Sequence, residues 1–121
     1  MGGGALATLD DLAKYALALP GAAVRNHYGG PDYHVAGRSF ALYWPPECRV
    51  ILKLPRPRQA LLFEIRPETF TPCSVGRGGV WSYVAIEALD AGELGHLVIE
   101  AWRTVAPKRL SRSIGGDAGP A

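Results

Sequence analysis

The sequence predicts an α+β fold, in which helices pack on one face of an antiparallel sheet. Three observations support this expectation. Residues 23–54 alternate polar and apolar side chains, turn sequences divide that stretch into short strands, and residues 90–106 carry apolar side chains at helical spacing. The expected order is a helix, several strands, a short helix, one or two strands and a long helix.

The first helix is expected to begin after Thr8 and to run to about Leu19. The Thr8 hydroxyl suits a helix cap, Asp11 occupies the third helical position, and Pro20 follows the last turn. The inward side of this helix is expected to consist of five apolar residues: Leu9, Leu12, Ala13, Ala16 and Leu17.

Four short strands are expected next, at residues 24–28, 33–36, 38–44 and 49–54, with turns at residues 29–32, at Gly37 and at residues 45–47. Alternation within the last two strands is typical of a sheet with one fully buried face. The alternating sets are Phe40, Leu42 and Trp44 against Ser39, Ala41 and Tyr43, and then Val50, Leu52 and Leu54 against Arg49, Ile51 and Lys53.

A second, shorter helix is expected to start near Pro57, which suits a first helical turn, and to end before Pro67. It is expected to direct Leu61, Leu62 and Ile65 inward. A weak extended segment at residues 70–74, a glycine-rich loop at residues 76–79 and a strand at residues 80–88 follow.

The last helix has a clear start and end. Asp90 can cap it, Glu93 suits its first turn, and Pro107 ends it. Its apolar stripe comprises Leu94, Leu97, Val98, Ala101, Trp102 and Val105. The stripe assigns Trp102 to the core, and core packing is also the simplest interpretation of Trp44 and Trp81.

With 121 residues, the chain is expected to form a single domain over residues 7–110, with a flexible segment 1–6 and a disordered tail 111–121. No stretch approaches the roughly 18 consecutive apolar residues of a membrane helix, and no secretory signal is visible. We therefore expect a cytoplasmic monomer that contacts no membrane.

Catalysis, metals and cofactors are not indicated. The sequence lacks G-x-S-x-G, H-E-x-x-H and P-loop motifs, so the chain is not expected to be an enzyme. Cys48 and Cys73 have no CxxC spacing and no nearby metal-ligand partners, which argues against a zinc site. A cytoplasmic setting favours free thiols.

Several segments, in order, resemble the YjbR/MmcQ-like family of small bacterial proteins. The resemblance covers about residues 9–110 and is carried by Ala18-Leu19-Pro20-Gly21, Gly30-Pro31-Asp32-Tyr33 with Val35 and Gly37, Leu52-Lys53-Leu54-Pro55, Pro67-Glu68-Thr69-Phe70, Gly76-Arg77, Trp81 with Tyr83-Val84, Ala101-Trp102-Arg103 and Ala106-Pro107-Lys108-Arg109-Leu110. It implies a CyaY-like α+β domain with a double-wing motif, a family commonly labelled DNA-binding.

The net charge of +2 does not itself predict nucleic-acid binding, but the cations are unevenly distributed. The leading hypothesis is weak or nonspecific DNA binding, because separate basic segments could contact phosphates without reading bases. The candidate residues are Lys53, Arg56, Arg58, Arg77, Lys108 and Arg109. No helix carries the side chains that a major-groove reader needs.

The alternative is a small-ligand or protein-binding module on the exposed face of the sheet, again without catalysis. Aromatic rings beside an arginine can stack on flat ligands or bases. The candidate residues are His27, Tyr33, Arg38, Tyr43 and Tyr83, with His34 beside them.

Overall fold

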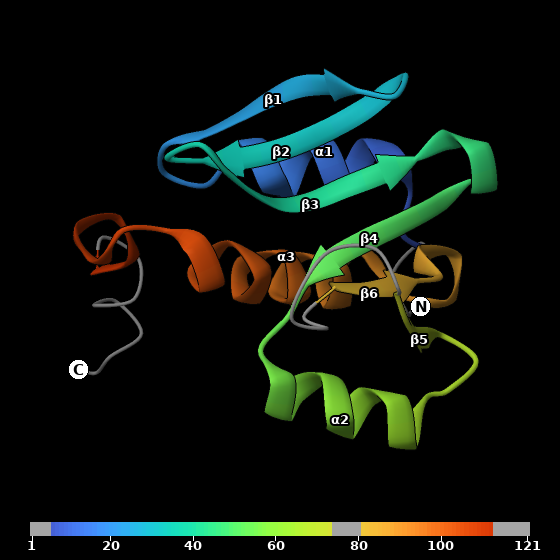
Figure 1. The fold of residues 1–121 in the computed structure, drawn as a ribbon. Helices are drawn as coiled ribbons and strands as arrows, with labels where there is room; N and C mark the ends of the chain where they lie inside the picture. The colour runs from blue at the N-terminus through green and yellow to red at the C-terminus, as the bar shows by residue number, and fades with distance from the viewer. Residues whose placement is uncertain (1–5, 74–80, 113–121) are drawn as a thin grey trace.

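One antiparallel sheet forms a layer of the protein, and helices cover one of its faces (Figure 1). The computed structural model describes residues 6–73 and 81–112. Its strands are β1 (Ala22–His27), β2 (Gly30–Val35), β3 (Arg38–Trp44), β4 (Arg49–Lys53), β5 (Phe70–Pro72) and β6 (Trp81–Val84), in the spatial order β1-β2-β3-β4-β6-β5. All neighbouring strands pair antiparallel, so the predicted fold class is confirmed.

Two helices pack side by side on the sheet, as Figure 1 shows, and a third helix lies near β5. They are α1 (Leu9–Leu17), α3 (Ala91–Val105) and α2 (Arg56–Ile65), respectively, with short 3-10 turns η1 (Pro45–Glu47) and η2 (Ile86–Ala88). Thr8 and Asp90 cap α1 and α3 through the predicted capping boxes. Among the described residues, no helix combines the length and apolar character that crossing a membrane requires.

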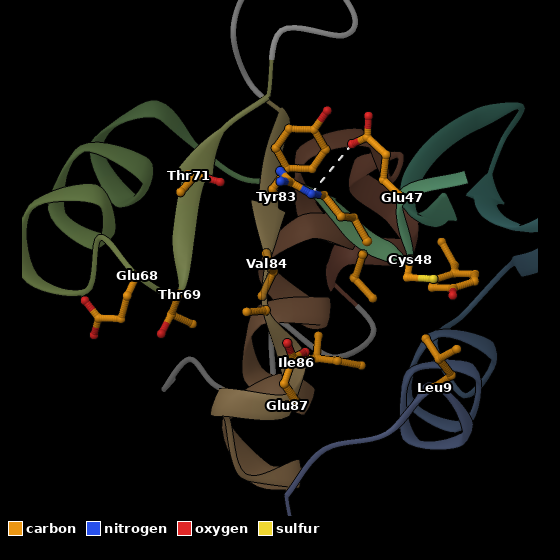
Figure 2. Close-up of a pocket in the computed structure, with 14 residues that line it drawn as sticks. Leu9, Glu47, Cys48, Glu68, Thr69, Thr71, Tyr83, Val84, Ile86 and Glu87 are labelled. Atoms are coloured by element: carbon orange, nitrogen blue, oxygen red, sulfur yellow. Dashed lines mark ion pairs between the residues drawn. The ribbon is translucent and has the colours of Figure 1, made fainter. Parts of the chain in front are cut away.

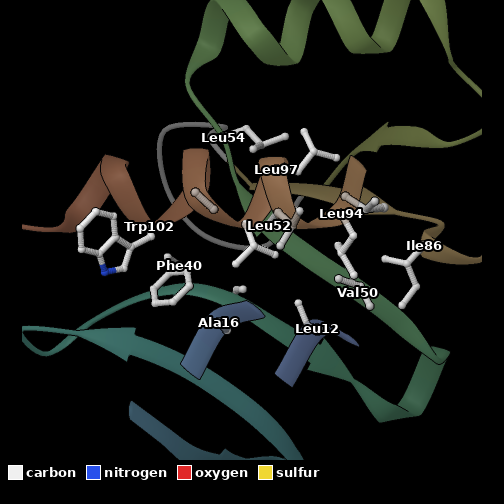
Figure 3. Packing of buried hydrophobic residues seen from close by; sticks show 14 of the residues in the cluster. Leu12, Ala16, Phe40, Val50, Leu52, Leu54, Ile86, Leu94, Leu97 and Trp102 are labelled. Atoms are coloured by element: carbon white, nitrogen blue, oxygen red, sulfur yellow. The ribbon is translucent and has the colours of Figure 1, made fainter. Parts of the chain in front are cut away.

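The core lies between the sheet and the helices α1 and α3 (Figure 3). Every residue of the predicted α3 stripe is buried there, including Trp102. Leu52 and Phe40 from the sheet meet Leu12 and Ala16 from α1 in the same cluster. The prediction of the α3 core face from its spacing is therefore confirmed.

Fewer residues of α1 and α2 are buried than the sequence predicts. Leu12 and Ala16 are buried in α1, whereas Leu9 and Leu17 are exposed. In α2, burial is confined to Gln59 and Leu62, so the prediction that Leu61 and Ile65 point inward is wrong. The reason is that α2 lies at the edge of the sheet, near β5, where one side of a helix finds little to pack against.

The first two hairpins close through two-residue turns, Tyr28-Gly29 and Ala36-Gly37. The φ angles of these residues are 52°, 86°, 52° and 79°, and two positive values in succession are the mark of a type I′ turn. The first turn is thus shorter than the predicted segment 29–32, so β2 begins at Gly30 and includes Pro31 and Asp32. The strand expected over residues 80–88 is likewise shorter, because η2 replaces its second half.

A β-bulge at Phe40 changes which side chains of β3 face the helices. Tyr33 pairs with Ala41 but His34 pairs with Ser39, so Phe40 is an extra residue in β3. Phe40 and Ala41 are consequently both buried in the core. Beyond the bulge the alternation is reversed, so Leu42 and Trp44 face away from the helices. The continuous alternation expected for this strand is therefore wrong.

Candidate functional site on the open sheet face

The face of the sheet opposite the helices carries aromatic and basic side chains. We call it the open face and define it by cross-strand register. Its members are Arg25, His27, Asp32, Leu42, Trp44, Arg49, Ile51, Lys53, Trp81 and Tyr83. Directly paired residues share a face, so Arg25, Asp32, Leu42, Ile51 and Tyr83 form one row across five strands.

A central hollow of about 380 Å³ lies in the open face. Leu42 and Ile51 give it an apolar lining, and Trp44, Trp81 and Tyr83 contribute aromatic rings. The remaining lining residues are polar: Arg25, Asn26, His27, Asp32 and Ser39. Apolar and aromatic walls with a few polar groups are typical of a ligand site.

Asp32 is the buried charged group of this hollow. Its side chain is 4% exposed and its Oδ2 accepts a hydrogen bond from Arg25 Nε at 3.2 Å. Arg25 Nη2 also donates to Ser39 Oγ at 3.3 Å. Asp32 Oδ1 is buried and has no hydrogen-bond partner among the described residues. A buried acceptor without a donor is energetically costly and is uncommon in folded proteins.

Two cations lie over aromatic rings on the open face. The Arg49 guanidinium carbon is 4.3 Å from the centre of the Tyr83 ring, and Lys53 Nζ is 5.7 Å from that of Trp81. Arg49 also contacts Glu47, with 3.6 Å between Nε and Oε1. Burial, followed by a hydrogen bond with Cys73, raises the pKa of Tyr83, so its hydroxyl stays neutral and can donate.

Aromatic rings also gather at one end of the hollow. Tyr28 and Trp44 meet edge to face with 5.3 Å between ring centres, and His27 lies 4.5 Å from Tyr28. Tyr28 combines a left-handed backbone, with φ of 52°, and a side chain that is 72% exposed. The first hairpin turn therefore presents an exposed aromatic ring beside the hollow.

A second cavity, of about 460 Å³, lies beside η1 and the end of β6 (Figure 2). Three carboxylates line it, from Glu47, Glu68 and Glu87, and Arg49 is the basic residue of the lining. A hydrogen bond with Cys48 and partial burial raise the pKa of Tyr43, another lining residue. The excess of carboxylates makes this cavity unfavourable for a polyanion. Among the described residues, no group of three His, Cys, Asp or Glu side chains could hold a metal ion.

A family model described as YjbR matches residues 17–104. The chain belongs to the YjbR family. The resemblance noted in the sequence is thereby confirmed. The YjbR fold of this chain is similar to the crystal structure of Deinococcus radiodurans protein DR2400, a DUF419 domain, with 21% identity and a TM-score of 0.73 over 91% of this chain and 89% of that chain. No curated protein matches the chain.

The structure places the predicted nucleic-acid residues of this YjbR chain in different layers. Lys53 lies on the open face, at the end of β4. Arg56 and Arg58 lie in the first turn of α2, where Arg58 Nε bonds Glu100 Oε1 of α3 at 3.1 Å. Lys108 and Arg109 are exposed in a helical turn beyond α3. Arg77 lies outside the described residues.

Of the residues predicted for a ligand on the exposed face, His27 and Tyr83 do lie on the open face. Tyr33 is 3% exposed and belongs to the core, and Tyr43 packs against the core from the same side of the sheet. Both placements correct the prediction, because Tyr33 and Tyr43 share a face with Ala41 and Val50. Arg38 is exposed at the start of β3.

Sequence reasoning missed Arg25, Asp32, Trp44 and Trp81 as members of the YjbR open face. The signal for Trp81 was present, since Val84 points inward and residues one and three positions before it must point outward. Because Val84 points inward, Trp81 and Tyr83 both point outward and lie on the same face of β6. For Trp44 the bulge removed the signal.

Proposed function

We propose that the protein binds nucleic acid through the open face and favours unpaired, single-stranded segments. The observation that carries the proposal is the placement of Lys53 near the Trp81 ring, on the same side of the sheet as the Trp44 and Tyr83 rings that line the hollow. Proteins that bind single strands combine aromatic rings, on which bases stack, with cations along the backbone.

The shape of the open face favours binding of a single strand over binding of a duplex. Trp44, Trp81 and Tyr83 surround a hollow about 380 Å³ in volume, so their rings are accessible to bases that are not already stacked in a helix. Among the described residues, the exposed side chains Lys108, Arg109 and Arg112 share one helical turn beyond α3, and no Asn or Gln accompanies them there. Phosphate contacts and stacking give little sequence preference, which agrees with weak or nonspecific binding.

Charge constrains the path of a strand across this face. The second cavity, with Glu47, Glu68 and Glu87, lies beside one end of the open face and repels phosphates. Lys53 is not among the residues that line that cavity, and we assign the main phosphate contact to it. Lys108 and Arg109 belong to the helical layer and have a secondary role in this proposal.

The second candidate function is binding of a small flat molecule in the central hollow. The volume of about 380 Å³ and the apolar and aromatic lining favour it. Under either function the proposal is a binding protein without catalysis or cofactor, acting as a monomer in the cytoplasm. Cys48 and Cys73, both free thiols in this structure, agree with that compartment.

The test is fluorescence anisotropy of a labelled 12-nucleotide thymidine strand at low salt, with the duplex of the same length as comparison. We expect binding of the strand, stronger than binding of the duplex. Trp44→Ala should weaken strand binding by about tenfold, because stacking contributes roughly 1–3 kcal/mol per base. Leu61→Ala, on the exposed side of α2, is the matched control and should bind like the wild type.

Absence of strand binding at low salt would overturn the proposal. Binding that survives Trp44→Ala but is lost when Lys108 and Arg109 are changed to Gln would assign the nucleic acid to the helical layer instead. Intrinsic fluorescence gives an independent readout, since Trp44 and Trp81 are on the open face and Trp102 is buried. A bound strand should quench the first two and leave Trp102 unchanged.

A further inference from the structure

We infer that the central hollow holds one nucleobase and that Arg25 and Asp32 together recognise its polar edge. This inference rests on the proposed function and assigns a base-recognition site within the open face. A base that fits this pair carries an N–H donor next to an acceptor atom on its own edge. Thymine has this arrangement at N3 and O4. The same chemistry is available from a base in a strand or from a free nucleotide.

Asp32 directs attention to the hollow because one of its carboxylate oxygens has no partner among the described residues. The carboxylate is almost fully buried, its Oδ2 is bonded to Arg25 Nε, and its Oδ1 lacks a donor among the described residues. A buried carboxylate oxygen in a recognition hollow selects for a ligand that brings an N–H. The base N–H supplies the missing donor.

Arg25 is the second member of the recognising pair. Its side chain is 51% exposed and is held by two contacts of 3.2 and 3.3 Å, to Asp32 and Ser39. Because Oδ1 is closed to solvent, a ligand reaches it only after a neighbouring side chain shifts, and the half-exposed Arg25 can make that shift by exchanging its contact with Ser39 for one with the ligand. After that movement the guanidinium still lies beside the carboxylate, where it can donate to the acceptor atom of the base.

The shape of the hollow supplies the stacking surface. Trp44 and Trp81 both line it, and Leu42 and Ile51 line it with apolar atoms. Tyr28 covers the edge of Trp44 at 5.3 Å and holds that ring in place. A flat heteroaromatic group therefore finds aromatic contacts for its faces and the Arg25–Asp32 pair for its edge.

The experiment separates stacking from edge recognition. It compares the labelled thymidine 12-mer with a 12-mer of difluorotoluene nucleotides, which have the shape of thymine but no comparable hydrogen-bonding edge. We expect the wild type to bind the thymidine strand at least fivefold more tightly. Asp32→Asn should reduce that preference to less than twofold, because it replaces a carboxylate acceptor with an amide donor. Asp10→Asn, the same charge change on an exposed residue of α1, should retain the preference.

Leu42→Phe is a second variant, which fills the hollow and leaves the Arg25–Asp32 pair intact; it should also remove the preference. Displacement of the thymidine strand by free thymidine monophosphate would assign the site to free nucleotides as well, and persistence of the preference without displacement would assign it to strands. Equal affinity of the wild type for both strands overturns the inference and leaves the proposed function standing. If neither strand binds, the proposed function and this inference fail together.

Discussion

Trp102 Nε1 donates a hydrogen bond to the carbonyl oxygen of Pro20 at 3.1 Å, across 82 residues of sequence. The indole is fully buried in the core, so its polar atom requires a partner inside the protein. The bond ties the last turns of α3 to the turn that follows α1. Trp102 therefore both packs in the core and hydrogen-bonds the turn at this end of the fold.

Removal of that bond should destabilise the protein. Trp102→Phe leaves a cavity and deprives the Pro20 carbonyl of its donor, with an expected loss of about 2–3 kcal/mol in the free energy of unfolding. Urea denaturation followed by circular dichroism measures it. Trp81→Phe, on the open face, should change the stability much less; equal losses for the two variants would contradict the assigned role.

Gly30 should not tolerate a side chain. A Cβ at this position would lie 2.5 Å from the backbone oxygen of Tyr43, which cannot move without shifting β3. We expect Gly30→Ala to lower the free energy of unfolding by about 1–3 kcal/mol. Gly95→Ala should be milder, because its Cβ meets the ring of Tyr15 at 2.9 Å and helical alanine is favoured over glycine. Thermal unfolding of both variants checks the order, and the reverse order would contradict it.

The second hairpin turn should accept a stabilising substitution. Ala36 has a φ of 52°, in the left-handed region, where alanine is strained and asparagine is well tolerated. Ala36→Asn should therefore raise the free energy of unfolding by about 1 kcal/mol, read from denaturant midpoints. Ala60→Asn in α2 is the control and should give no gain, since asparagine is a poorer helix former. A loss at Ala36 would refute the turn assignment.

Burial of Tyr33 should make the stability depend on alkaline pH. Burial raises the pKa of the Tyr33 hydroxyl above its ordinary value of 10.0, so the folded protein favours the neutral form. Its contribution is complete below the unfolded pKa and is lost as pH rises through the higher folded pKa. Between about pH 9 and pH 12, Tyr33→Phe should lose less stability than the wild type, measured by urea midpoints. Tyr28→Phe, at an exposed position, should follow the wild type.

Salt dependence should distinguish the open face from the helical layer. Each cation that neutralises a phosphate of a single strand contributes about 0.7 to the slope of log affinity against log salt. Lys53→Gln should therefore reduce the slope by about that amount. Lys108→Gln should leave the slope nearly unchanged. The opposite result would place the interface on the cations beyond α3.

Local patterns were sufficient to predict α1, α2, α3 and most of the strands, although the first turn and the end of β6 differ from the prediction. The caps at Thr8 and Asp90 mark the starts of α1 and α3, and the spacing of Leu94 to Val105 defines a stripe that is buried throughout. These features depend on residues within a few turns of one another. The exposed positions of α2, including Leu61 and Ile65, could not be predicted in the same way, because their burial depends on where the helix lies in the sheet architecture.

The candidate site was predicted only in part, because it depends on register between strands. His27 and Tyr83 were identified and do lie on the open face. Asp32 could not be recognised, since its importance comes from Arg25 on the neighbouring strand and from burial of one oxygen. Of the described basic candidates, Arg56, Lys108 and Arg109 are exposed and Lys53 and Arg58 are partly exposed, but sequence distance does not reveal whether two of them belong to the same layer.

The bulge at Phe40 has an evolutionary consequence. It inserts one residue between Ser39 and Ala41, so that Phe40 and Ala41 both face the core while Leu42 and Trp44 stay on the open face. Deletion of that single codon would restore regular pairing, keep the indole outside and remove a phenyl ring from the core. Among homologues, loss of one residue here would therefore mark a lineage that keeps its sheet surface and rebuilds the core beneath it.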